Sequence, residues 1–209
     1  MNKLDRIQSE KFSKQEARHE TVIESNEWIL ENCSFGFFDI ETGNLNAPFS
    51  RIIGACILER GKSTVLQYQA GRTDKVMLSK LRNKLEEQDY VVTYYGTGFD
   101  IPYLNTRLII HGLRPLAAIR HIDLYYTARH FLKLHSNRLA TVGDTLLGAS
   151  GKTQILPAVW EKALTRDKAA LKYVMEHCVA DVEDLERVFD KLVGFRNLGA
   201  TPLKGGYFG

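Results

Sequence analysis

The apolar stretch Phe35-Gly36-Phe37-Phe38-Asp39-Ile40-Glu41-Thr42 decides how this chain folds. It predicts a β-strand over residues 35–42, because it is a strongly apolar run of strand length. Alternate side chains of a strand share one face, so Asp39 and Glu41 project together. Two adjacent carboxylates in an apolar strand repel each other and lose hydration. A cation such as Mg²⁺ or Mn²⁺ would neutralise them, whereas the alternative is a strand end with two solvated acids.

The composition is that of a globular protein with a real core. The chain has 209 residues and a formal net charge of +3, which permits a nucleic-acid partner without arguing for one. Its three cysteines are scattered and include no Cys-x-x-Cys pair, so neither a disulfide framework nor a zinc knuckle is expected. The N-terminal segment has no apolar signal region, and no stretch approaches the length of a membrane span. We therefore expect an intracellular, cytoplasmic protein with no membrane partner.

Hydrophobic periodicity predicts an order of elements that defines the fold class. Strands are expected at residues 35–42, 51–58, 63–69, 90–95 and 119–124. Helices are expected at residues 74–87, 99–111, 125–134, 138–147, 157–164 and 167–194. Three antiparallel strands, followed by parallel strands that alternate with helices, make an α/β fold with a mixed five-stranded sheet. This order is compatible with a ribonuclease H-like fold.

The chain divides into three parts. Residues 1–33 are expected to form a helical N-terminal extension, because apolar residues there are too sparse for a deep core face. Residues 34–195 are expected to form the domain itself. Residues 196–209 are a glycine-rich C-terminal tail.

Two further acids accompany the later helices. Asp100 follows residues 96–99 at the start of a predicted helix, where an N-cap is the plain alternative to a ligand. Asp181 lies at the edge of the apolar stripe of the last helix, and His177 lies one turn before it on the same side. An acid beside a histidine suits a metal ligand next to a proton acceptor, whereas an ion-paired helix surface is the alternative. Asp184, in the turn after Asp181, is a rival for the carboxylate role.

Three segments resemble, in order, the three motifs of the DEDD (DnaQ-like) 3′→5′ exonuclease superfamily. They are Phe38–Thr42, Gly96–Leu104 and His177–Val182. The similarity points to the YprB-type branch and to the proofreading domains of family B polymerases. The acids at the motif positions are Asp39, Glu41, Asp100 and Asp181. The resemblance implies that they hold two divalent ions, Mg²⁺ or Mn²⁺, which activate a water and stabilise charge on the scissile phosphate.

The resemblance also implies a residue that orients or deprotonates the water. In the family this residue is a Tyr four residues before the third-motif acid, or a His five residues before it. In this chain His177 occupies the four-residue spacing, so the chain departs from both classes. Imidazole accepts a proton near neutral pH more easily than phenol, and we assign the role to His177.

Three positions are expected to contact the nucleic acid. Thr42 and Phe99 flank the acids, where the family grips the terminal nucleotide. Tyr95 replaces an Asn that many relatives carry, and it either stacks a base or packs. Nearby, Asp123 is expected to end a strand and to support the following turn.

The sequence therefore predicts a metal-dependent 3′→5′ exonuclease. It would release nucleoside monophosphates from the 3′ end of single-stranded DNA or RNA. Two alternatives stay open, namely a structure-selective endonuclease on the same fold and a nuclease fold that only binds nucleic acid. The sequence does not indicate which proteins are its partners.

Overall fold

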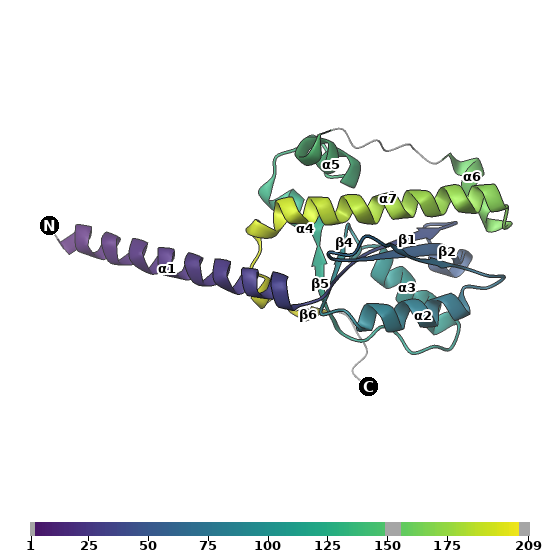
Figure 1. The fold of residues 1–209 in the computed structure, drawn as a ribbon, viewed down its shortest axis with the longest axis horizontal. Helices are drawn as coiled ribbons and strands as arrows, with labels where there is room; N and C mark the ends of the chain where they lie inside the picture. The colour runs from purple at the N-terminus through teal and green to yellow at the C-terminus, as the bar shows by residue number, and fades with distance from the viewer. Residues whose placement is uncertain (1–2, 149–155, 205–209) are drawn as a thin grey trace.

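A mixed sheet organises the chain, as Figure 1 shows. The computed structural model describes residues 3–148 and 156–204. The strands are β1 (Phe35–Thr42), β2 (Ile52–Glu59), β3 (Leu66–Gln69), β4 (Tyr90–Thr93), β5 (Ile119–Asp123) and β6 (Leu203–Lys204). Their order in the sheet is β3-β2-β1-β4-β5-β6.

Strand directions place three carboxyl ends at one edge of the sheet. β1 pairs antiparallel with β2, and β2 pairs antiparallel with β3. In contrast, β1 pairs parallel with β4, and β4 pairs parallel with β5. The predicted five strands and their directions are confirmed. β6 is an addition that pairs antiparallel with β5. It comprises only two residues, which is too short to leave a periodic pattern in the sequence.

Helices cover both faces of the sheet. They are α1 (Lys3–Asn32), α2 (Lys75–Glu86), α3 (Asp100–Ile110), α4 (Leu124–Phe131), α5 (Leu139–Leu147), α6 (Pro157–Leu164) and α7 (Lys168–Leu192), with 3₁₀ turns η1 (Ala47–Phe49), η2 (Val193–Phe195) and η3 (Leu198–Ala200). In Figure 1, α7 lies along one face, and α2 and α3 lie along the other.

The alternation of side chains along β1 decides which residues face α7. Phe35 and Phe37 each place their ring centroid 5.4 Å from that of Phe189 on α7. Phe38 and Ile40 belong instead to the core on the opposite face, with α2 and α3. Odd-numbered positions of β1 therefore face α7, and the next odd positions along the strand carry the two acids.

Gly54 allows α7 to approach the sheet closely. A Cβ atom at this position would lie 2.2 Å from Sδ of Met175 on α7. Gly54 is also the register partner of Glu41 on β1. The contact therefore brings the turn of α7 that follows Met175 next to the carboxyl end of β1.

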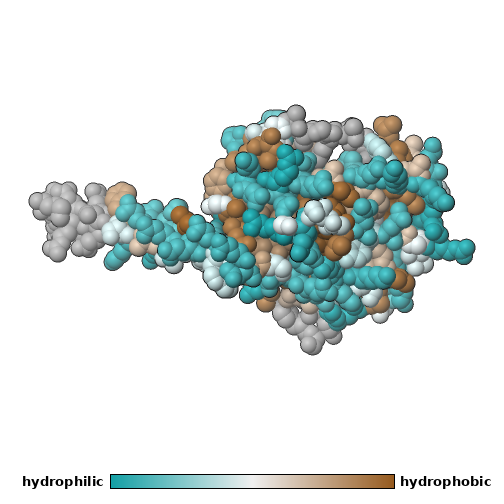
Figure 2. All heavy atoms as spheres, viewed as in Figure 1, coloured by the Kyte–Doolittle hydropathy of each residue, from teal (hydrophilic) through white to brown (hydrophobic). Residues whose placement is uncertain are grey.

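The helix α1 leaves the body of the domain and is anchored at its C-terminal end (Figure 1). Where α1 is coloured in Figure 2, its visible face is mainly hydrophilic. Near the anchor, the Asn26 side chain donates to Arg196 O at 2.6 Å and accepts from Leu198 N at 2.8 Å. Ile29 is buried. The described part of the predicted tail thus joins α1 to the sheet through η3 and β6. None of the described helices combines the length and the apolar character needed to cross a membrane.

Candidate functional site

The two acids of β1 lie side by side beneath α7. Asp39 is half-buried, and Glu41 is 8% exposed. A carboxylate oxygen of each residue and Sγ of Cys178 on α7 all lie within 4.8 Å of one another. Carboxylate oxygens at this spacing suit a single shared cation.

Cys178 acts on Asp39 through its thiol. Its Sγ lies 3.6 Å from Asp39 Oδ2 and 3.7 Å from the Asp39 backbone oxygen. Burial raises the pKa of the Cys178 thiol well above its usual range, and contact with Cys56 and the charge of Asp39 add to the effect. The thiol therefore stays protonated and donates to Asp39, which orients this carboxylate.

Asp100 enters the site from the start of α3. Phe99 is the N-cap residue of this helix, and Asp100 is its first helical residue, so the N-cap alternative for Asp100 is wrong. Asp100 Oδ1 instead accepts a hydrogen bond from the backbone N of Ile40 at 3.2 Å. Because Ile40 lies between Asp39 and Glu41, this bond holds Asp100 beside both acids.

His177 lies between an acid of β1 and an acid of its own helix. Its Nδ1 is 3.8 Å from Glu41 Oε1 and 3.7 Å from Asp181 Oδ1. The rival acid Asp184 pairs instead with Arg187, at 3.2 Å. The structure thus brings Asp181, rather than Asp184, to the acids of β1.

The carboxylates raise one another's pKa. Burial is the largest cause that raises the pKa of Asp39 well above its ordinary value, followed by the charges of Glu41, Asp100 and Asp181. Burial likewise raises the pKa of Asp100 to about 7, with Asp123 and Asp181 adding to it and backbone hydrogen bonds opposing it. Such acids hold protons near neutral pH unless a cation replaces them. A buried set of hard oxygen donors with this property fits a divalent ion.

A pocket of about 460 Å³ lies beside Glu41. Thr42 of β1, Phe99 before α3 and Trp160 of α6 line it. The structure therefore brings together the two residues that were predicted to grip a nucleotide, and adds an aromatic ring from a third element.

Tyr95 does not line this pocket. It follows β4 with a backbone φ of 65°, and it is 46% exposed. Its ring contacts those of Tyr125 and Tyr126, with centroid distances of 4.9 and 6.4 Å. Asp123 supports the turn that follows it, as predicted, because its carboxylate accepts from Tyr125 N at 3.1 Å. The same carboxylate also holds the loop after β4, because it accepts from Tyr95 N at 2.8 Å and from Thr97 N at 2.9 Å.

The sequence alone does not reveal two residues of the site. Cys178 appears there only as a member of the apolar stripe of α7, although its position three residues before Asp181 is a signal that could have found it. Trp160 carries no local signal. Its helix α6 reaches the site through tertiary packing. A Cβ atom at Gly43 would lie only 2.5 Å from Cδ1 of Leu164, so this glycine lets α6 approach the end of β1.

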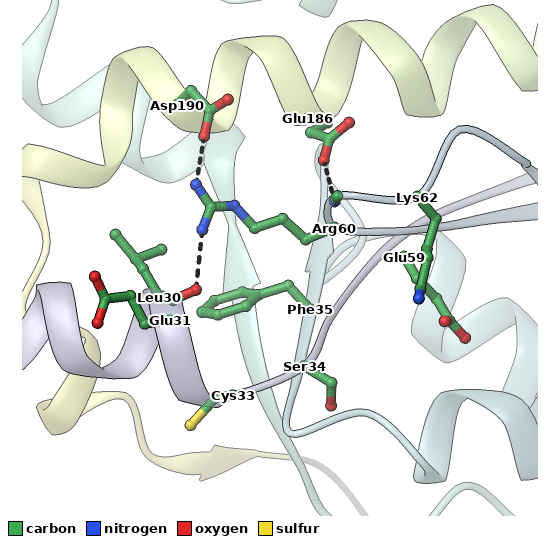
Figure 3. A pocket seen from close by; sticks show the side chains of 11 residues that line it. Leu30, Glu31, Cys33, Ser34, Phe35, Glu59, Arg60, Lys62, Glu186 and Asp190 are labelled. Atoms are coloured by element: carbon green, nitrogen blue, oxygen red, sulfur yellow. Dashed lines mark hydrogen bonds and ion pairs between the residues drawn. The ribbon is translucent and has the colours of Figure 1, made fainter.

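A second pocket, of about 480 Å³, lies at the opposite end of β1 (Figure 3). There Arg60 donates to Leu30 O at 3.1 Å and pairs with Asp190 at 3.1 Å. Gly61 N donates to Glu186 at 3.3 Å. Arg60 thus connects the end of α1 to α7, and the described lining of this pocket includes none of the predicted site residues.

Residues 36–193 match the RNase_H superfamily. The chain belongs to the RNase_H superfamily. This membership confirms the ribonuclease H-like resemblance and the α/β fold class that the sequence predicts.

Two DNA polymerases are similar to this RNase_H superfamily chain. A DNA polymerase of Methanocaldococcus jannaschii is 27% identical over 126 residues, which cover 50% of this chain and 8% of that protein. The structure of the family B DNA polymerase from the hyperthermophilic archaeon Pyrobaculum calidifontis superposes with a TM-score of 0.67 at 20% identity, covering 77% of this chain and 24% of that one. The chain thus spans a small part of the length of either polymerase. The superfamily match and the shared fold make it a nuclease-type domain.

Proposed function

We propose that this chain is a metal-dependent 3′→5′ exonuclease that acts on single-stranded nucleic acid. The observation that carries the proposal is the convergence of four carboxylates from three elements, β1, α3 and α7. Burying like charges together costs free energy unless a cation compensates them. Such a cluster is therefore the part of this fold best explained by metal-dependent chemistry.

The four acids would hold two divalent ions, Mg²⁺ or Mn²⁺. Ions of this kind lower the pKa of a bound water and neutralise the charge that develops on a scissile phosphate. The ligands are oxygens of Asp39, Glu41, Asp100 and Asp181. Cys178 keeps Asp39 in orientation, and the backbone of Ile40 does the same for Asp100.

His177 is suited to handle the attacking water. The distances from its Nδ1 to Glu41 and Asp181, 3.8 and 3.7 Å, exceed those of an ordinary hydrogen bond and can be bridged by a water. Imidazole accepts a proton near neutral pH. We therefore assign to His177 Nδ1 the orientation of the water and the acceptance of its proton.

The pocket beside Glu41 is the place for the terminal nucleoside. Its volume of about 460 Å³ falls within the range of pockets that bind small ligands. Phe99 and Trp160 offer rings for a base, and Thr42 offers a hydroxyl for the sugar or the phosphate. A 3′ end seated there would place its last phosphodiester next to the acids.

The test is digestion of 5′-labelled single-stranded DNA, duplex DNA and RNA, each with Mn²⁺ or with EDTA. We expect products shortened one nucleotide at a time from the 3′ end of single strands, and only with the metal. Asp39→Asn and Asp181→Asn should each lower the rate by about 10²–10³-fold, as expected when charge stabilisation is lost. Asp184→Asn is the matched control on the same helix and should digest like the wild type.

Two results would contradict the proposal. One is full digestion by either Asp39→Asn or Asp181→Asn. The other is cleavage of a circular single strand, which has no 3′ end and would instead indicate an endonuclease.

A further inference from the structure

We propose that Tyr95, Tyr125 and Tyr126 form a platform on which unpaired bases of the substrate strand stack, a few nucleotides from its 3′ end. We call these three side chains the tyrosine platform. The inference rests on the proposed function, because it states how the same site would hold the rest of the strand.

The sheet places the platform along the same edge as the acids. Tyr95 comes two residues after β4, and Tyr125 and Tyr126 lie at the start of α4, directly after β5. β1, β4 and β5 are parallel, so their carboxyl ends share one edge. β5 lies two strands from β1, or about 10 Å at the usual strand spacing. That distance corresponds to roughly three stacked nucleotides.

The three rings contact one another and remain open to solvent. Tyr95 is 46% exposed and Tyr126 is 45% exposed, with Tyr125 between them and half-buried. The ring centroids of Tyr125 and Tyr126 are 5.2 Å apart, and those of Tyr95 and Tyr125 are 4.9 Å apart. Every base has a face that stacks on an aromatic ring, so such a surface holds a single strand with little sequence preference.

The backbone at Tyr95 is strained, and one carboxylate holds it. Its φ of 65° lies in the left-handed region, which bulky side chains rarely adopt. Asp123 accepts from the N–H groups of Tyr95, Thr97 and Tyr125, at 2.8, 2.9 and 3.1 Å. A single side chain therefore fixes both halves of the platform, the loop after β4 and the start of α4. Strain of this kind persists where the surroundings enforce it, and it is concentrated at binding sites.

The loop also links the platform to the acid cluster. A Cβ at Gly98 would lie 2.6 Å from Cζ of Tyr95, so the Tyr95 ring occupies space that only glycine leaves. The N–H groups of Gly98 and Phe99 donate to Tyr95 O at 3.0 and 3.1 Å, and Asp100 follows directly. The loop would thus hold a nucleic-acid strand stacked on the platform at a fixed position relative to the carboxylates.

The experiment measures binding without cleavage. Fluorescence anisotropy in EDTA gives the Kd of a labelled single-stranded oligonucleotide and of its twin with abasic residues at the second to fourth positions from the 3′ end. The wild type should bind the intact strand about 10- to 100-fold more tightly than the abasic twin, as base–aromatic stacking predicts. Tyr126→Ala, at an exposed helical position, should lose most of that difference, and Tyr126→Phe should restore it.

Two further variants guard against a structural artefact. Tyr95→Asn removes the ring and inserts a residue that tolerates the left-handed backbone. It should behave like Tyr126→Ala. Phe12→Ala removes an exposed ring on α1, the helix that projects from the body of the domain (Figure 1), and should bind like the wild type. Equal affinity of the wild type for the two strands, or an equal loss of both affinities in the variants, would overturn the platform.

A separate readout distinguishes failure of the platform from failure of the proposed function. The p-nitrophenyl ester of thymidine 5′-monophosphate is small enough to occupy only the pocket beside Glu41. If the wild type hydrolyses this ester with Mn²⁺ but does not discriminate the abasic strand, the platform alone is wrong. If the wild type hydrolyses neither the ester nor any oligonucleotide, the proposed function is wrong, and the binding comparison still decides the platform.

Discussion

Asp39 illustrates how a residue of the proposed metal site can lower the stability of the fold. Burial and the charges of Glu41, Asp100 and Asp181 raise its pKa well above the ordinary value. A carboxyl whose pKa is higher in the folded state favours folding at low pH. That contribution is lost as the pH rises through the folded-state pKa.

Asp39→Asn replaces this carboxyl with a neutral amide of the same size. In EDTA at pH 8 the variant should be more stable than the wild type by about 1 kcal/mol or more, because the neutral amide removes a poorly hydrated charge that three neighbouring acids repel. For a chain of this size, each kcal/mol corresponds to a rise of about 2–4 °C in Tm. The gain should shrink as the pH falls and disappear below the ordinary pKa of an Asp carboxyl, about 3.9, where Asp39 is protonated in both states. Thermal unfolding at several pH values measures it, and a lower Tm at pH 8 would contradict it.

For single residues, the sequence predicts which acids share a face, but it does not predict the side chains that pack around them. Asp39 and Glu41 are predictable because strand periodicity alone places them on one face. For Tyr95 the sequence indicates only that the residue is a candidate contact. It does not show that the backbone φ is 65° or that the ring contacts that of Tyr125 on α4. Trp160 depends on how its helix packs on the sheet, which no local pattern encodes. For Cys178 the only local signal is its place one turn before Asp181.

Among the secondary-structure elements, α1 is attached to the domain by few described contacts. Arg60 donates to Leu30 O at the end of α1 and pairs with Asp190 on α7 (Figure 3). Asn26 holds the other side of the helix through residues 196–198. Residues 11–25 of α1 are mainly exposed, so the described contacts that attach the helix lie in this short segment.

We therefore predict that Arg60→Met loosens the C-terminal end of α1. Met keeps the apolar stem of the side chain but loses both the hydrogen bond and the ion pair. Amide hydrogen exchange in residues 26–32 should become about 5- to 10-fold faster, as the loss of about 1 kcal/mol implies. Lys62→Met, in the same turn, is the control and should exchange like the wild type. Equal protection in both variants would show that Arg60 does not anchor the helix.

The elements themselves are largely predictable. β1 to β5 and the six helices after residue 74 follow from apolar runs and helical spacing, with bounds that differ by a few residues. β6 is not predictable, because a strand of two residues exists only through its pairing with β5. The division at residues 33 and 195 stays a prediction.

For the whole molecule, metal binding by the four acids separates a metal-dependent nuclease from a nuclease fold that only binds nucleic acid. We predict that Mn²⁺ binds with a stoichiometry of two and releases protons near pH 7, because acids with raised pKa values must lose them first. The affinity should increase by about tenfold or more from pH 6 to pH 8, since the pKa of Asp100 alone lies at about 7.

Calorimetric titration in buffers of different ionisation enthalpy measures both the affinity and the proton release. Asp184→Asn should titrate like the wild type, whereas Asp100→Asn should lose the part of the pH dependence that Asp100 contributes and keep the part that Asp39 contributes. A wild-type protein that shows no Mn²⁺ site at pH 8 would support the alternative of a subunit that only binds nucleic acid.

The projecting helix α1 has a mechanical consequence. At about 1.5 Å per residue, its 30 residues span roughly 45 Å, which exceeds twice the radius of gyration of about 17 Å expected for a compact chain of this length. It is fixed near one end, so it acts as a lever. A change of only a few degrees at Asn26 and Arg60 would move the far tip through several ångströms, and a force on the tip would act on the contacts that these two residues make.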